Sequence, residues 1–158
     1  MSDLPPEDSP EARFFRWIAQ TMKWYAIEEM RKHRWHLSRA ASRDLGMAAC
    51  DDWEHRFWTK FCRWRLFEHI EGLQCWIELN GREFAVLKNV RVFNDLLDEM
   101  LKLMKDRKVH RDDLEMIQWA QSNPRICKEH VYQFLLVINV NSARDVKLPE
   151  EWKRIAAA

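Results

Sequence analysis

The chain has 158 residues, of which 47% are apolar and 32% are charged, with three glycines and five prolines. That length and composition favour one folded, helix-rich domain and exclude a disordered or low-complexity chain. The net charge is +1, so the chain lacks the global basic excess of most nucleic-acid-binding domains. Residues 13–65 are locally basic, with twelve Lys or Arg against six Asp or Glu, which keeps an anionic partner open.

The first ten residues and the cysteines indicate a cytoplasmic protein. The segment MSDLPPEDSP is acidic and Pro-rich, unlike a signal peptide, and no apolar run approaches the roughly 18 residues of a membrane helix. The four cysteines form neither a CxxC pair nor a disulfide framework, so we expect reduced thiols and no membrane partner. We expect residues 1–8 to be a disordered leader and residues 9–158 a single helical domain.

Ser9-Pro10-Glu11 predicts the start of a first helix. The segment supplies a capping hydroxyl, a proline at the first helical position and an acid near the positive end of the helix dipole. Neither Gly nor Pro follows before Gly46, so this helix is expected to run to about Arg39. Its apolar residues share one broad face at the helical period: Phe14, Trp17, Ile18, Thr21, Met22, Trp24 and Tyr25.

A second helix is predicted from Leu45–Met47 to Gly72, with Asp44 as its N-terminal cap. Two apolar stripes run along it side by side, which means that neighbours cover it on two sides. We therefore expect it to be the central helix, with the first stripe mostly buried. The first stripe holds Cys50, Trp53, Phe57, Phe61 and Trp64, and the second holds Trp58, Cys62, Leu66 and Ile70.

Residues 73–93 allow two interpretations. Trp76–Leu79 and Arg82–Val86 flank Asn80-Gly81 as the strands of a β-hairpin flank a type I′ turn. The alternative is an irregular loop between helices.

Further helices follow. The order of acidic and basic residues predicts one from about Asn94 to Lys108, and the capping-box spacing of Asp112 and Glu115 predicts a short one through Gln121. The last two are predicted from Asn123-Pro124 to about Asn141 and from Pro149, carrying Trp152. The predicted fold is mainly α, a compact bundle of about five to six helices, with a short β-hairpin around Asn80-Gly81 as the open feature.

Glu29, His33 and His36 continue the apolar line of the first helix at spacings of four and three, and Glu68 follows Trp64 on the second. Carboxylates and imidazoles that converge inside a bundle can bind a metal, although the usual Glu-x-x-His pair is absent. The alternative is a polar end of the bundle that faces water, and we expect this outcome and no cofactor.

Arg56, Lys60 and Arg63 share one face of the second helix, away from its apolar stripes. A basic face beside aromatic residues can follow a phosphate backbone. The alternative is a solvated face whose long side chains cover neighbouring apolar groups. No helix-turn-helix, zinc-finger or RNA-binding signature is present.

The segment from Lys32 to Gly46, KHRWHLSRAASRDLG, followed by Ala49 and Asp52-Trp53, resembles a bacterial domain family of unknown function. Members have the form E-H-R-W-x-L-S-E-x-A-G-R-D-V-G and often lie near kinase-like domains. Lys32 and Arg39 stand where members tend to have acids, and Ser42 stands where they have Gly. The resemblance implies a bacterial, cytoplasmic origin and assigns no catalytic residue. We interpret the segment as a corner between two helices, with Trp35 and Leu37 packed inward and Arg43-Asp44 fixing the turn.

Nucleotide-binding, hydrolase and metalloprotease motifs are absent, so an enzyme is less expected than a binding module. Nine tryptophans exceed what one core easily covers, and Trp is enriched in interface anchors. We therefore predict an accessory or regulatory module that binds a protein partner. The alternatives are the nucleic-acid-binding subunit and the metal-binding bundle. The predicted anchors are Trp17, Trp24, Trp119 and Trp152.

Overall fold

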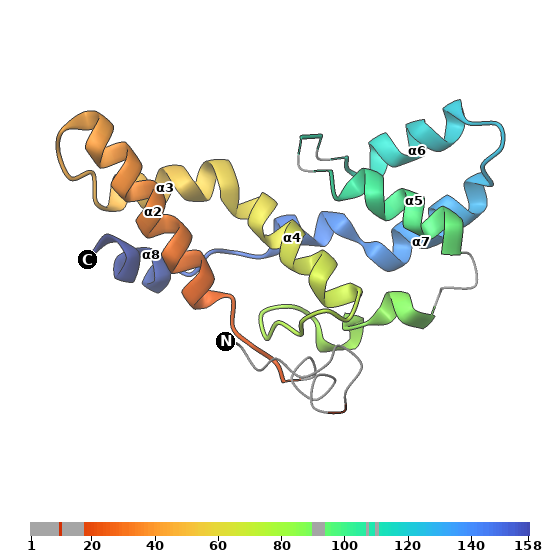
Figure 1. Ribbon diagram of the computed structural model, residues 1–158, viewed down its shortest axis with the longest axis horizontal. Coiled ribbons are helices and arrows are strands. Elements are labelled where there is room, and N and C mark those ends of the chain that lie inside the picture. Colours follow the sequence, from red (N-terminus) through yellow and green to blue (C-terminus); the bar gives the residue numbers. More distant parts are fainter. Residues whose placement is uncertain (1–9, 11–17, 90–93, 107, 110) are drawn as a thin grey trace. The chain divides into compact units, whose positions relative to one another are not determined.

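A computed structural model describes residues 10, 18–89, 94–106, 108–109 and 111–158 (Figure 1). The predicted leader and the Ser9 helix start lie outside these residues. The described chain is mainly helical, as predicted, and its seven α-helices slightly exceed the predicted five to six. They are α2 (Lys23–Ala41), α3 (Met47–Trp53), α4 (Thr59–Ile70), α5 (Asn94–Met104), α6 (Asp113–Ser122), α7 (Lys128–Ile138) and α8 (Glu150–Ala157). Short helical turns occupy Gly81–Glu83, Val86–Asn89 and Val140–Asp145, and a π-helix occupies Glu54–Trp58.

The predicted first helix does not run unbroken to Arg39. Ile18 lies in a bend, and Gln20 pairs with a distant segment: its N–H donates to the Cys75 carbonyl at 2.9 Å, and its carbonyl accepts from Ile77 N–H at 2.9 Å. These bonds compete with helical ones, and α2 begins only at Lys23. Its end at Ala41 is close to the predicted one.

The second helix follows its predicted course but contains a π-helical turn, Glu54–Trp58, between α3 and α4. A π turn holds one residue more than an α turn, so it rotates the residues beyond it relative to those before it. Cys50 and Trp53 of the first stripe are buried as predicted, whereas Phe57, Phe61 and Trp64 are only half-buried. The buried line passes instead to the second stripe, Trp58, Cys62, Leu66 and Ile70.

The predicted β-hairpin around Asn80-Gly81 is wrong, and the loop alternative holds. The buried ring of His69 organises this segment: its Nδ1 accepts from Trp76 N–H at 3.1 Å, so its Nε2 carries the proton and donates to the Asn80 carbonyl at 2.8 Å. The His69 carbonyl also accepts from Ala85 N–H at 2.8 Å. The Ile77 N–H, which a hairpin would pair with Phe84, instead donates to the Gln20 carbonyl, so the segment is held as a loop around His69.

The later helices lie near their predicted places. Asp112 caps α6, accepting from Glu115 N–H at 3.0 Å, and α8 follows Pro149, as the sequence predicts. The helix predicted from Asn123 begins only at Lys128. Asn123 ends α6 instead, because its side chain donates back to the Trp119 carbonyl at 3.1 Å.

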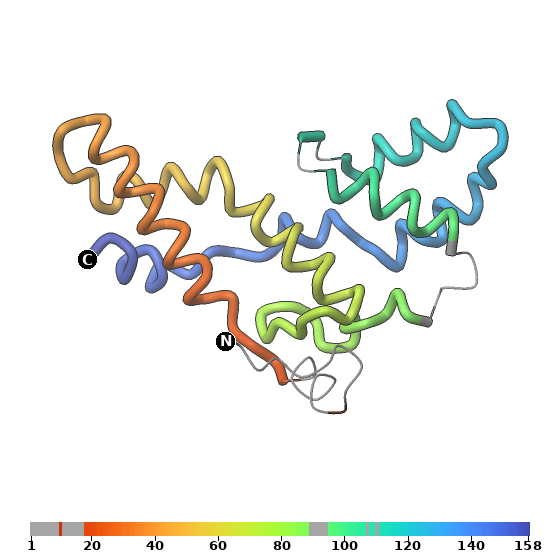
Figure 2. The backbone as a smooth tube through the Cα atoms, viewed as in Figure 1, coloured from red at the N-terminus to blue at the C-terminus, as the bar shows by residue number. Residues whose placement is uncertain are grey.

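The contacts divide the chain into two compact units, and the division falls inside α4. The α2/α3/α8 unit comprises Thr21–Arg63 and Ala143–Ala158, and Figure 2 shows α8 beside α2 and α3. Lys153 holds α8 in place: it is 5% exposed, and its Nζ lies 3.0 Å from both Asp51 Oδ1 and Glu54 Oε1 and 2.8 Å from Glu150 Oε1.

The other unit includes Trp64–Ser142 and the segment that ends at Gln20. In it α6 packs against α7, and α7 contacts the turn Val86–Asn89. The core of this unit includes Phe67, Leu97, Met100, Met116, Phe134 and Ile138. The single domain predicted for residues 9–158 stays a prediction. Within the described residues, no helix has both the length and the apolar character of a membrane span.

Candidate functional site

Helix α2 has one buried face and one exposed face. The buried face carries Met22, Ala26, Ile27 and Met30, each at most 1% exposed, and lies in the part of the unit where α2 meets α3 and α8. The opposite side is exposed, and besides Glu28 it carries four residues that we call the α2 stripe: Trp24, Arg31, Trp35 and Arg39. At the helical period they fall within an arc of about 80°. Both indoles expose more than half of their surface, 58% for Trp24 and 56% for Trp35.

The helix that carries this stripe is firmly held to α3. His33 Nε2 lies 2.7 Å from Asp52 Oδ2, and the His33 ring meets the Phe57 ring edge-on, with centroids 5.4 Å apart. The His33 hydrogen bond lowers the pKa of Asp52. A fixed helix presents its exposed side chains in one arrangement, which reduces the conformational entropy lost when a ligand binds.

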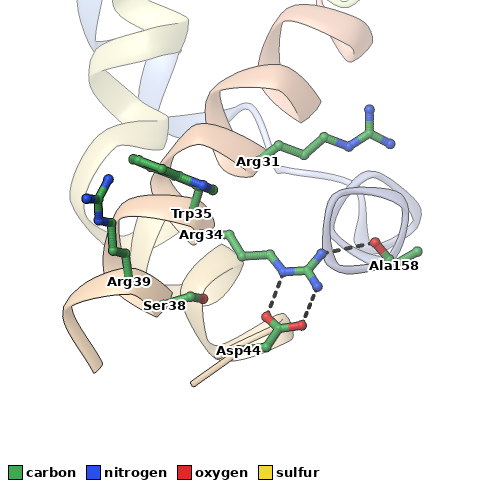
Figure 3. A pocket seen from close by; sticks show the side chains of 7 residues that line it. All are labelled: Arg31, Arg34, Trp35, Ser38, Arg39, Asp44 and Ala158. Atoms are coloured by element: carbon green, nitrogen blue, oxygen red, sulfur yellow. Dashed lines mark hydrogen bonds and ion pairs between the residues drawn. The ribbon is translucent and has the colours of Figure 1, made fainter. Parts of the chain in front are cut away.

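The loop after α2 is tied back to the helix. Arg34 donates to both oxygens of Asp44, from Nε at 2.9 Å and from Nη2 at 2.6 Å (Figure 3). These bonds, together with Gly46 N–H, lower the pKa of Asp44 to about 2. Ser38 Oγ accepts from Leu45 N–H at 3.0 Å. Asp44 therefore fixes the turn, as expected from the sequence, and its partner is Arg34.

A hollow of about 520 Å³ opens beside this loop. It is lined by Arg31, Arg34, Trp35, Ser38, Arg39, Asp44 and Ala158. The Arg39 guanidinium lies over the Trp35 ring, 5.1 Å from its centroid. Among the described residues, neither Arg31 nor Arg39 has a carboxylate within ion-pair distance. The hollow therefore presents two positively charged guanidinium groups beside the exposed Trp35 indole.

The predicted tryptophan anchors fall in different environments. Trp24 is exposed, Trp119 is half-buried, and Trp17 lies outside the described residues. Trp152 is buried at 8% exposure and contacts Trp58, with ring centroids 6.2 Å apart, so it belongs to the core of its unit.

Trp35 was expected to pack inward, and this prediction is wrong. It lies on the side of α2 opposite Met30, because five positions along a helix correspond to about 140° of rotation. Sequence reasoning also missed Arg31 and Arg39. The spacing of Met22, Ala26 and Met30 could have indicated which side of the helix faces water, but not which of its arginines lack an acidic partner.

The four residues considered for a metal enter separate contacts. Glu29 lies 3.8 Å from Lys32 Nζ, His33 pairs with Asp52, and the His36 ring packs edge-on against Trp35 at 5.0 Å. Glu68 accepts from Arg65 at 2.7 Å, and its pKa is raised by burial. In the part of the chain that the structure describes, no three His, Cys, Asp or Glu side chains gather as a metal site would require.

The residues considered for nucleic acid are less uniformly presented than the α2 stripe. Arg56 and Lys60 are exposed, and Arg63 is half-buried. Arg56 lies over the Phe57 ring, and its Nη1 is 3.5 Å from Asp52 Oδ2, so part of its charge is already paired.

Comparisons with protein-family models, with curated proteins and with solved structures found no match to this chain. Function must therefore be inferred from the chemistry of the exposed residues. The α2 stripe combines apolar indole surface with guanidinium donors, a pairing suited to recognising another molecule.

Proposed function

We propose that this protein is a non-enzymatic accessory or regulatory module that binds a protein partner on the exposed face of α2. The observation that carries the proposal is the pair of tryptophans, Trp24 and Trp35, exposed on one stripe of a fixed helix. Indole surface in contact with water is costly, and covering it supplies much of the free energy of association in protein interfaces.

The residue types of the stripe match those of interface anchors. Trp and Arg are enriched among the residues that contribute most to protein–protein binding. Trp24 and Trp35 are eleven positions apart, which corresponds to about 16 Å along the helix axis. That separation lies within a standard interface, which covers about 800 Å² on each partner.

The charges around the stripe support a protein partner over a nucleic acid. Glu28 and Glu29 are exposed on the same helix, and both lie near Lys32, at 3.5 and 3.8 Å from its Nζ. A phosphate backbone running along the stripe would meet the Glu28 carboxylate, which lies within the same arc, whereas a protein surface can match alternating charges. The Arg56/Lys60/Arg63 alternative and the metal-binding alternative are outcomes of the experiment below.

The test places a photo-crosslinking residue at position 24 or 35 of the full chain in the native host, and a control one at position 136. Leu136 is 81% exposed on α7, outside the α2/α3/α8 unit. It is therefore at least as open to solvent as Trp24 and Trp35 but does not belong to the α2 stripe. We expect the same protein to be crosslinked from positions 24 and 35 and not from 136. Nuclease treatment before analysis should leave the adduct intact.

A double variant, Trp24→Gln/Trp35→Gln, serves as the loss-of-function arm. Gln keeps the helix propensity and removes the indoles. We expect it to lose the partner in affinity purification, while Arg56→Gln/Lys60→Gln retains it. Adducts that disappear with nuclease, loss of the partner only in the Arg56/Lys60 variant, or stoichiometric metal lost in His33→Ala/His36→Ala would contradict the proposal.

A further inference from the structure

The three arginines of the hollow are used in different ways. The Arg34 guanidinium donates to Asp44 and to two backbone oxygens, those of Ala156 and Ala158, each at 3.0 Å. Arg31 and Arg39 have no such partners among the described residues. Because Arg34 already neutralises Asp44, the hollow keeps a positive charge that its own lining does not compensate.

We infer that the partner segment that docks here is acidic, a peptide whose carboxylates pair with Arg31 and Arg39 on the two sides of Trp35. This inference rests on the proposed function and specifies the chemistry of its partner. Guanidinium groups bind carboxylates through two parallel hydrogen bonds, which gives both affinity and orientation.

Trp35 lies between Arg31 and Arg39, so it determines which residue of the partner peptide fits between its two acidic residues. Figure 3 shows Arg39 beside the Trp35 ring, with Arg31 on the other side of it. The stacking of Arg39 on Trp35 holds both side chains in place before binding. The remaining exposed surface of Trp35 suits an apolar or aromatic side chain of the partner.

The spacing along α2 sets the spacing in the partner. Arg31 and Arg39 are eight positions apart, which corresponds to about 12 Å along the axis. An extended peptide covers this distance in about four residues. The matching pattern is therefore an acid, an apolar residue two positions on, and a second acid two positions beyond.

Isolated carboxylates suit this face better than a continuous polyanion. Glu28 projects from the same side of α2, close to the line from Trp24 to Trp35, and its side chain is 67% exposed. A peptide with acids only opposite Arg31 and Arg39 avoids Glu28, whereas phosphates at every step of a nucleic acid do not.

The experiment uses a labelled synthetic peptide, Gly-Glu-Ser-Phe-Ser-Glu-Gly, titrated with the full chain and followed by fluorescence anisotropy. We expect saturable binding that weakens about tenfold or more when both Glu are replaced by Gln, since two ion pairs are lost. The protein variant Arg31→Gln/Arg39→Gln should weaken binding of the acidic peptide to a similar degree. Arg56→Gln/Lys60→Gln, which removes the same charge from another face, should not.

Other anions are tested in the same assay. Inorganic phosphate and single-stranded oligothymidine should compete with the peptide poorly. Tighter binding of oligothymidine than of the peptide would overturn the inference, as would no peptide binding at millimolar concentration or equal binding of the Glu and Gln peptides. If the crosslinked partner is lost on Trp35→Gln but the Arg31/Arg39 variant binds the acidic peptide normally, the docking face stands and the acidic class fails. If no partner is crosslinked from position 35, the proposed function itself fails.

Discussion

The α2/α3/α8 unit contains two groups of tryptophans that differ in what surrounds them. Trp53, Trp58 and Trp152 are buried together, with ring centroids 6.0 and 6.2 Å from that of Trp58. The Trp58 N–H donates to the Val146 carbonyl at 2.7 Å. Trp24 and Trp35 instead lie in water, each beside a cation: Lys23 is 4.9 Å from the Trp24 centroid, and Arg39 is 5.1 Å from that of Trp35.

The cations of the unit divide in the same way. Lys153 is buried among three carboxylates, whereas Arg31 and Arg39 are exposed without any among the described residues. The nine tryptophans therefore do not all have the same role. One group of aromatic and basic residues is buried and holds the unit together. The other is exposed on the face that we propose for a partner, so substitutions in the two groups should separate stability from binding.

The largest effect should come from the buried tryptophans. Trp58→Ala should lower the free energy of unfolding by about 3–5 kcal/mol, because it removes a large buried ring and leaves a cavity. Phe57→Ala, one position away and half-buried, should cost clearly less. Urea denaturation of both variants checks this. Equal losses would mean that the π-helical register of Glu54–Trp58 is wrong.

Replacing the buried cation should cost less than that. We expect Lys153→Met to lower the free energy of unfolding by about 2 kcal/mol, since three carboxylates lose a charged donor but remain partly solvated. Burial alone would lower the pKa of Lys153, but hydrogen bonds to Glu150, Glu54 and Asp51 outweigh it and raise the pKa.

The sign of the pH dependence follows from that raised pKa. The contribution of Lys153 should be fully present below the unfolded pKa of about 10.4 and fade as the pH rises above it. Urea midpoints of wild type and Lys153→Met, measured from neutral to strongly alkaline pH, should therefore converge at the alkaline end. A constant difference would rule out the ionic origin.

A smaller, acid-side effect is expected at the loop beside the hollow. The Arg34 hydrogen bonds lower the pKa of Asp44 to about 2, so its contribution to stability is present above the unfolded pKa of about 3.9 and is lost as the pH falls toward 2. Thermal melting of wild type and Asp44→Asn should differ at neutral pH and coincide near pH 2, and melting curves that stay apart there would contradict the assignment.

The smallest effect on stability should come from the exposed tryptophans. Trp24→Gln/Trp35→Gln should change the free energy of unfolding by no more than about 0.5 kcal/mol, as most surface substitutions do. The same variant should lose most of the tryptophan fluorescence that iodide quenches, since iodide reaches exposed indoles. A large loss of stability would mean that Trp24 and Trp35 stabilise the fold, as the buried tryptophans do, and would remove the basis of the proposed interface.

The sequence predicted features that depend on local chemistry. Asp112 caps α6 and α8 begins after Pro149, and both features depend on residues within a turn or two. Backbone hydrogen bonds between residues far apart in the chain could not be predicted from the sequence. The break at Gln20 depends on Cys75 and Ile77, and the lost hairpin depends on His69, which carries no signal of its own in the sequence.

The site was predicted only in part for a related reason. Trp35 was predicted to pack inward because the position of the buried side of α2, marked by Met22, Ala26 and Met30, was not taken into account. Arg31 and Arg39 look like any surface arginines until the structure shows that Arg34 alone takes Asp44. The loop after α2 places Asp44 beside Arg34, and this leaves Arg31 and Arg39 without an acidic partner among the described residues. The amino-acid composition alone does not show this pairing.

The π-helical turn between α3 and α4 also bears on how this chain tolerates insertions and deletions. A change of one residue inside an α-helix normally rotates everything beyond it by about 100° and turns its core face outward. Here the π-helical turn Glu54–Trp58 already contains one residue more than an α-helical turn would. Deleting one of them would bring Trp58 four positions after Trp53, the spacing at which an ordinary helix points both indoles the same way. The helix can thus shorten by one residue at this turn and keep Trp58, Cys62 and Leu66 on its inner side.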